Sequence, residues 1–94
     1  MPATYEIRDT GSLASTTTSN IVVGRSVDIS LSGTWVGTVK LQRLMAGDWR
    51  DTGDTWTANV EAVADSARFT QWRLSFTRTS GTLVYELRGD DIDV

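Results

Sequence analysis

Hydrophobic and polar residues alternate with a period of two through most of the chain after residue 25. Residues 26–32 place Val27, Ile29 and Leu31 on one face and polar residues on the other. This period is typical of a β-strand with one face in a hydrophobic core. Further strands are expected in residues 36–44, 49–50, 55–63, 69–79 and 82–88. The expected core consists of Val27, Ile29, Leu31, Val39, Leu41, Trp56, Val60, Trp72, Leu74, Phe76, Leu83, Tyr85 and Leu87.

Turn residues separate these strands at three places. Turns are expected at residues 46–48 and 51–54, where Ala, Gly and Asp gather. Ser80 and Gly81 are expected to close a hairpin, because glycine readily takes the positive φ of a tight turn. This hairpin would set Phe76 opposite Tyr85.

The first 25 residues differ from the rest. Residues 10–20 contain one large apolar side chain, Leu13, which predicts a polar arm preceded by an edge strand near residues 5–8. We therefore divide the chain into an N-terminal edge strand and arm (1–25) and a β-sandwich domain (26–94). The predicted fold is all-β: an Ig-like antiparallel two-sheet β-sandwich of about seven strands with a flexible N-terminal arm.

Composition narrows the function classes. The 94 residues contain no Cys and no His, which excludes disulfides, thiol chemistry, zinc sites of the Cys/His type and a histidine general base. A net charge of −3 argues against nucleic-acid or anionic-membrane partners. The N-terminus has neither the basic nor the apolar region of a signal peptide, so we expect synthesis in a cytoplasm. We expect that the protein has no enzymatic activity and binds no cofactor.

The segment from Asp51 to Trp56 follows the pattern D-x-G-x-T-W of the Asp-box, a turn in which Asp bonds backbone N–H groups. Asp48, Asp51 and Asp54 offer oxygen ligands for Ca²⁺ as an alternative, although the EF-hand spacing is absent. The turn-stabilising interpretation is favoured, and no metal site is predicted.

The segment Ser32–Arg43, SGTWVGTVKLQR, resembles a segment of small β-sandwich virion proteins of tailed bacteriophages. Two further stretches resemble the same family: TANVE at residues 57–61, and WRL at 72–74 followed by TSGT at 79–82. The resemblance spans residues 26–88. The family has an Asp-Gly-Gly turn before its Trp, where this chain has Ala46-Gly47-Asp48.

The resemblance implies a virion structural protein, of the capsid decoration or cement type, that docks on the head shell and stabilises it. Its partners would be the major capsid protein, other virion proteins or further copies of itself, and its location the virion. The alternative is an outward-facing head-fibre or tail adhesion module that binds host-surface glycans through exposed Trp side chains.

Seven residues are candidates for an interface. The predicted hairpin sets two arginines opposite each other on the outer face, where an acidic partner or an internal ladder with Glu86 would relieve their repulsion. The remaining candidates are aromatic or apolar residues expected near or outside the core, which would form a contact patch if they cluster around a Trp. The full set is Trp35, Val36, Trp49, Phe69, Arg73, Val84 and Arg88.

Overall fold

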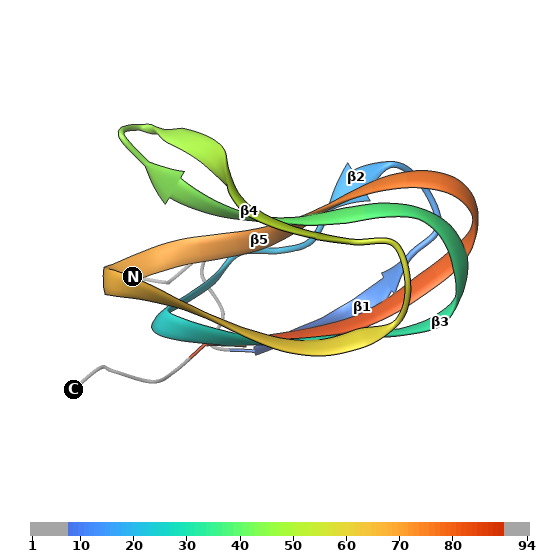
Figure 1. Ribbon diagram of the computed structural model, residues 1–94, viewed down its shortest axis with the longest axis horizontal. Coiled ribbons are helices and arrows are strands. Elements are labelled where there is room, and N and C mark those ends of the chain that lie inside the picture. Colours follow the sequence, from blue (N-terminus) through green and yellow to red (C-terminus); the bar gives the residue numbers. More distant parts are fainter. Residues whose placement is uncertain (1–7, 90–94) are drawn as a thin grey trace.

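The computed structural model describes residues 8–89 and contains only strands, turns and short loops in that range (Figure 1). The strands are β1 (Arg8–Leu13), β2 (Thr17–Thr18), β3 (Val22–Met45), β4 (Asp48–Trp56) and β5 (Val60–Gly89). The predicted all-β class is confirmed. Within the described residues there is no helix long and apolar enough to cross a membrane.

Hydrogen bonding joins these strands into one sheet with the order β1-β5-β3-β4, and β2 pairs with β5 outside that path. Residue numbers rise along one strand while they fall along its partner, so the pairing is antiparallel. For example, β3 residues Ile29 and Leu41 lie opposite β5 residues Leu87 and Leu74. In this strand order, β3 and β5 form the centre of the sheet.

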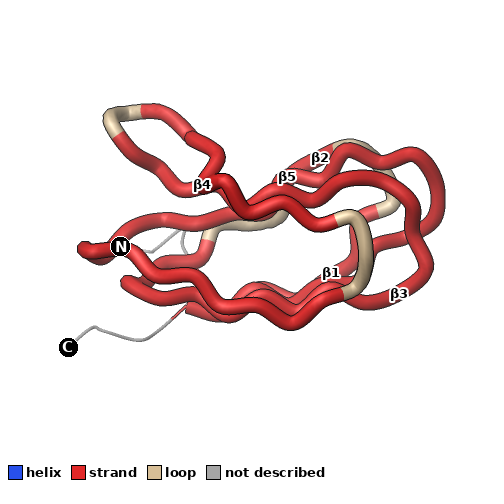
Figure 2. The backbone as a smooth tube through the Cα atoms, in the orientation of Figure 1, coloured by secondary structure: helices blue, strands red, loops and turns tan. Residues whose placement is uncertain are grey.

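The sheet bends back on itself because β3 and β5 both turn back at the same end of the molecule (Figures 1 and 2). A lower layer holds β1 with residues 26–34, 60–65 and 82–89. An upper layer holds β2, β4 and residues 36–45 and 70–79. The prediction of about seven strands in two separate sheets is not confirmed, because β3 and β5 pass through the bends without losing their pairing.

The core lies between the two layers. The buried side chains come from alternate positions of β3 and β5, which is the periodicity that the sequence shows. Most predicted core residues are fully buried, while Trp56 and Val60 are partly buried against them. Val22 is buried and was not predicted. The complete set is Val22, Val27, Ile29, Leu31, Val39, Leu41, Trp72, Leu74, Phe76, Leu83, Tyr85 and Leu87.

The predicted hairpin at Ser80–Gly81 is wrong. Residues 72–78 and 80–89 do not pair with each other in the sheet; both pair with β3, and the register shifts by one residue at Thr79. Phe76 lies opposite Val39, and Tyr85 lies opposite Leu31. The alternation predicted the inward face of each segment correctly, but two inward faces meet equally well across a core and side by side in a sheet.

The two other predicted turns have different outcomes. Ala46 and Gly47 form a tight turn between β3 and β4, with φ angles of 55° and 81°. Residues 51–54, by contrast, are an irregularity within β4. Asp51 is paired with Gln42, and the register shifts before the next pairing with β3. The strand continues because residues on both sides of the irregularity keep their partners.

The segment predicted as a polar arm also differs, as far as the structure describes it. β1 pairs with residues 83–88, and β2 pairs with residues 75–76, so both lie in the sheet. Main-chain pairing attaches them, which a count of apolar side chains does not reveal. The edge strand predicted near residues 5–8 and the tail after residue 89 lie almost wholly outside the described residues, and the domain division at residue 26 stays a prediction.

Candidate interaction surface

The seven candidate residues do not form one surface, but three of them lie together on the outer face of the upper layer. Arg73 lies between two buried β5 residues, Trp72 and Leu74, so its side chain points away from the core. Its guanidinium carbon lies 4.4 Å from the centre of the Trp49 ring, a cation–π contact. Phe69, on the same face of β5, is 53% exposed.

Two further apolar residues extend this patch. Leu44 lies opposite Trp49 in the β3–β4 ladder. Leu44 and Phe69 also line a shallow hollow of about 270 Å³ together with Val23. We call Val23, Leu44, Trp49 and Phe69, with Arg73, the Trp49 surface. The parity of Leu44 is opposite to that of the buried residues Val39 and Leu41, so alternation along the strand places it outside the core. Val23 stands in a short apolar run without alternation, which does not reveal its face.

The charge of Arg73 is not paired with a carboxylate of the described residues. Its Nε donates a hydrogen bond of 2.8 Å to the side-chain oxygen of Gln42. Gln42 in turn donates to Asp51, which also forms an ion pair with Lys40 at 3.6 Å. Partial burial lowers the pKa of Arg73. The guanidinium thus lies over the indole ring of Trp49, while its terminal nitrogens keep donor capacity.

Arg88 lies on the outer face of the lower layer, far from the predicted position opposite Arg73. It is opposite Asp28, to which it donates two hydrogen bonds of 3.2 and 2.9 Å. A second ion pair, at 4.0 Å, joins it to Glu86. The hydrogen bond and the charge of Asp28 raise the pKa of Arg88. The predicted arginine pair is therefore wrong, and internal carboxylates satisfy this arginine.

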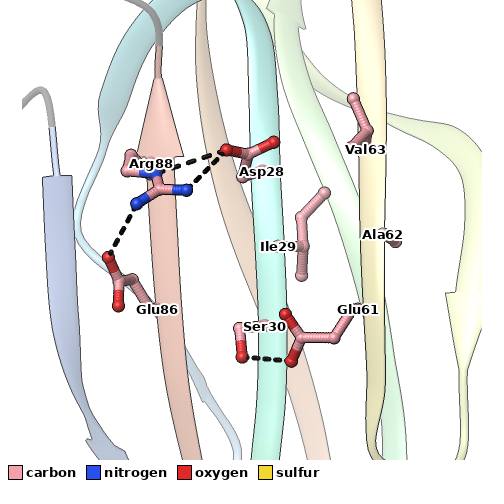
Figure 3. A pocket seen from close by; sticks show the side chains of 8 residues that line it. All are labelled: Asp28, Ile29, Ser30, Glu61, Ala62, Val63, Glu86 and Arg88. Atoms are coloured by element: carbon pink, nitrogen blue, oxygen red, sulfur yellow. Dashed lines mark hydrogen bonds and ion pairs between the residues drawn. The ribbon is translucent and has the colours of Figure 1, made fainter.

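Arg88 belongs to a charged hollow of about 560 Å³ (Figure 3). On its other side, Ser30 donates a 2.5 Å hydrogen bond to Glu61. Every charged side chain that lines the hollow therefore has a partner within it. No group of three or more potential metal ligands gathers anywhere in residues 8–89. The hydrogen bonds and ion pairs among the lining residues join the outer faces of three strand segments. They leave no pair of free carboxylates in the hollow.

The other three candidates lie apart. The Trp35 ring meets Phe76 edge-on at 5.7 Å, and its indole N–H donates a 2.7 Å hydrogen bond to Asn59. Trp35 therefore fastens the loop between β4 and β5 to the bend of β3. Val36, at that bend, and Val84, on the lower layer, are exposed but separate from the Trp49 surface.

The Asp-box interpretation finds partial support in the geometry. Thr52 accepts a hydrogen bond from the backbone N–H of Asp54 through its hydroxyl, and Gly53 has a φ of 103°. Asp51 does not bond the turn, since its carboxylate accepts from Gln42. The carboxylates of residues 48, 51 and 54 do not form a metal-binding group in the described structure.

No protein-family model matches the chain, and no curated protein matches it. Among solved structures, the chain is similar to the crystal structure of the SPBc2 prophage-derived protein YomS. The TM-score is 0.62 at 15% sequence identity, over 87% of this chain and 93% of the other. At this identity, the likeness establishes a shared fold.

Proposed function

We propose that this chain is a structural protein of a tailed-bacteriophage virion, and specifically a capsid decoration protein that docks on the head shell. The resemblance of residues 32–43 to phage sandwich proteins supports the setting, as does the shared fold with a prophage-derived protein. We further propose that the folded-over sheet is an Ig-like sandwich in which the straight segments of β3 and β5 serve as separate strands. The proposal assigns no catalysis and no cofactor.

The observation that carries this proposal is the Trp49 surface. Its apolar side chains come from neighbouring strands and are partly buried, except Phe69, which is exposed. An apolar patch that is left open to solvent is a common mark of protein–protein contact. Trp and Arg are enriched among the residues that contribute most of the binding energy in such contacts. Here the two are already in contact with each other, so docking would order few additional groups.

The surface suggests the chemistry of its partner. Arg73 has terminal N–H donors and no carboxylate partner in residues 8–89, so a partner that presents a carboxylate beside apolar side chains would be complementary. A major capsid protein, or another virion protein, with such a site is the proposed partner. Copies repeated by the symmetry of the shell would add avidity. The chain would be made in the bacterial cytoplasm and incorporated into the virion there.

The alternative role, glycan binding by an outward-facing adhesion module, has less support from the geometry. Stacking on sugars requires an open aromatic face. Trp35 is engaged by Phe76 and Asn59, and one face of the Trp49 ring is covered by Arg73. Under this alternative, Trp49→Ala would abolish glycan binding. Under the decoration role, the same variant would bind the head shell more weakly.

A reconstitution experiment tests the proposal. Particles of the phage or prophage that encodes the chain are prepared without this protein and mixed with the purified chain. We expect Phe69→Ser and Arg73→Gln each to weaken binding by about tenfold or more, because loss of a central contact residue often costs about 2 kcal/mol. Val84→Ser is the matched control, since it removes an exposed apolar side chain from the opposite layer and should bind normally.

Two results would contradict the proposal. The first is the absence of the protein from purified native particles. The second is an equal loss of binding in Val84→Ser and Phe69→Ser, which would mean that the Trp49 surface is not the docking face. Circular dichroism and thermal melting of each variant separate a lost contact from a lost fold.

A further inference from the structure

Strand β1 contributes little to the apolar core. Its inward positions, opposite Leu87, Tyr85 and Leu83, are occupied by Asp9, Gly11 and Leu13. Leu13 is the only large apolar side chain among these three, and it is only partly buried. All fully buried hydrophobic side chains of the described residues come from residues 22–87. Removing β1 would therefore leave the set of core side chains intact.

β1 is held by its main-chain pairing with β5 and by a group of polar side-chain contacts, which we call the polar clasp. The Asp9 side chain is buried, and its carboxylate accepts a 2.5 Å hydrogen bond from the Tyr85 hydroxyl. Asn20 donates two more, from its backbone N–H at 3.2 Å and its side-chain amide at 3.1 Å. Gly11 leaves room for the ring, because an added Cβ would lie 3.3 Å from the Tyr85 hydroxyl oxygen. These contacts are specific to the residues of this chain.

The next segment is attached separately. The backbone of Ser19 donates to the carbonyl of Leu74, and the backbone of Leu74 donates to the Ser19 hydroxyl, both at 2.9 Å. The Thr16 hydroxyl also accepts a 2.9 Å hydrogen bond from the backbone of Arg78. Between these anchors and β1 lie only Ala14 and Ser15, which are exposed and outside the sheet pairing. β1 is thus a separately held strand on a two-residue connector.

We propose that β1 exchanges between two copies of this chain, so that each copy's β1 pairs with β5 of the other. The exchanged form would repeat every contact of β1, including the clasp between Asp9 of one copy and Tyr85 of the other. Exchange of identical elements is a route to dimers that needs no new interface chemistry. A second copy fits the site because its Asp9 would meet the same Asn20 and Tyr85 side chains that Asp9 meets within one chain.

Shortening the connector provides the first test. β1 pairs in the lower layer and β2 in the upper layer, and packed sheet layers lie about 10 Å apart. With Ala14 and Ser15 deleted, Leu13 would join Thr16 directly, and one peptide spans about 3.8 Å between Cα atoms. The strand then cannot reach its own β5. We expect light scattering to give close to twice the 10.3 kDa mass of one chain.

A cysteine pair identifies the strand that is exchanged. Thr10 lies opposite Glu86, and the chain has no native cysteine. In the dimer fraction, Thr10→Cys with Glu86→Cys should form a covalent dimer on oxidation. The control, Ser32→Cys with Val84→Cys, joins β3 to β5 within one copy and should give a covalent monomer in the same fraction.

The inference would be overturned if the deletion variant remained monomeric at its highest soluble concentration while its sheet was retained. It would also be overturned if the Thr10–Glu86 pair closed only within single chains in every fraction of the full-length protein. The unshortened chain, refolded at high concentration, should yield both closed monomer and exchanged dimer. Failure of capsid binding would leave these results unchanged, because the inference does not depend on the virion role.

Discussion

Replacing Gly81 with Ala tests the structure found at Ser80–Gly81, where β5 bends while it stays paired with β3. Gly81 and Gly47 have the same φ of 81°, but their surroundings differ. A Cβ on Gly81 would lie 2.7 Å from the Cα of Trp35 and closer still to the carbonyl oxygen of Thr34. A Cβ on Gly47 would have no atom within 4 Å. The two substitutions therefore share their backbone strain and differ in crowding.

The magnitudes follow from this comparison. An L-residue with a left-handed backbone costs roughly 1–2 kcal/mol relative to glycine, and this applies to both positions. Gly81→Ala also forces apart the two strands where they cross the bend, and overpacking of this kind typically costs about 1–3 kcal/mol. We expect Gly47→Ala to lower the free energy of unfolding by about 1 kcal/mol and Gly81→Ala by about 3 kcal/mol.

Urea denaturation followed by tryptophan fluorescence measures both changes. The four tryptophans report on the fold as a whole, and an unchanged dependence on urea concentration shows that the same structure unfolds. If the two variants lost equal stability, the crowding at Gly81 would be refuted. An open hairpin turn at Ser80–Gly81 would give that result.

Two further predictions concern individual side-chain hydrogen bonds. Tyr85→Phe removes a donor from buried Asp9 and should lower the free energy of unfolding by about 1.5–3 kcal/mol. Burial and the bond to Asp9 raise the pKa of Tyr85, so the wild type should lose stability as the pH rises above about 10. The variant should lose less, and urea unfolding across that range would show whether it does. The hydrogen bond from Gln42 lowers the pKa of Asp51 below 3.8, so any stabilisation by that carboxylate is present at higher pH and fades as the pH falls through the lowered value. An NMR titration should give a higher Asp51 midpoint in Gln42→Ala, and an unchanged midpoint would show that another group sets it.

The sequence by itself predicted which residues face the core, because each strand side chain points to the face opposite its neighbours. That rule placed Trp72, Leu74 and Phe76 correctly without any knowledge of their partners. It failed at Val22, which stands in a short apolar run without alternation. The residues of the Trp49 surface were partly predictable for the same reason, since Phe69 and Arg73 have the outward parity of β5.

The tertiary structure decided which strands are neighbours. Alternation is unchanged whether residues 72–78 and 82–88 pair in a hairpin or face each other across the core, so nothing local distinguishes the two. Backbone pairing with β3 selected the second arrangement and separated Arg73 from Arg88 onto different layers. It also placed Asp9, Asn20 and Tyr85 together, although 76 residues separate the first from the last. The faces of strands follow from local geometry, whereas their partners depend on contacts between distant segments.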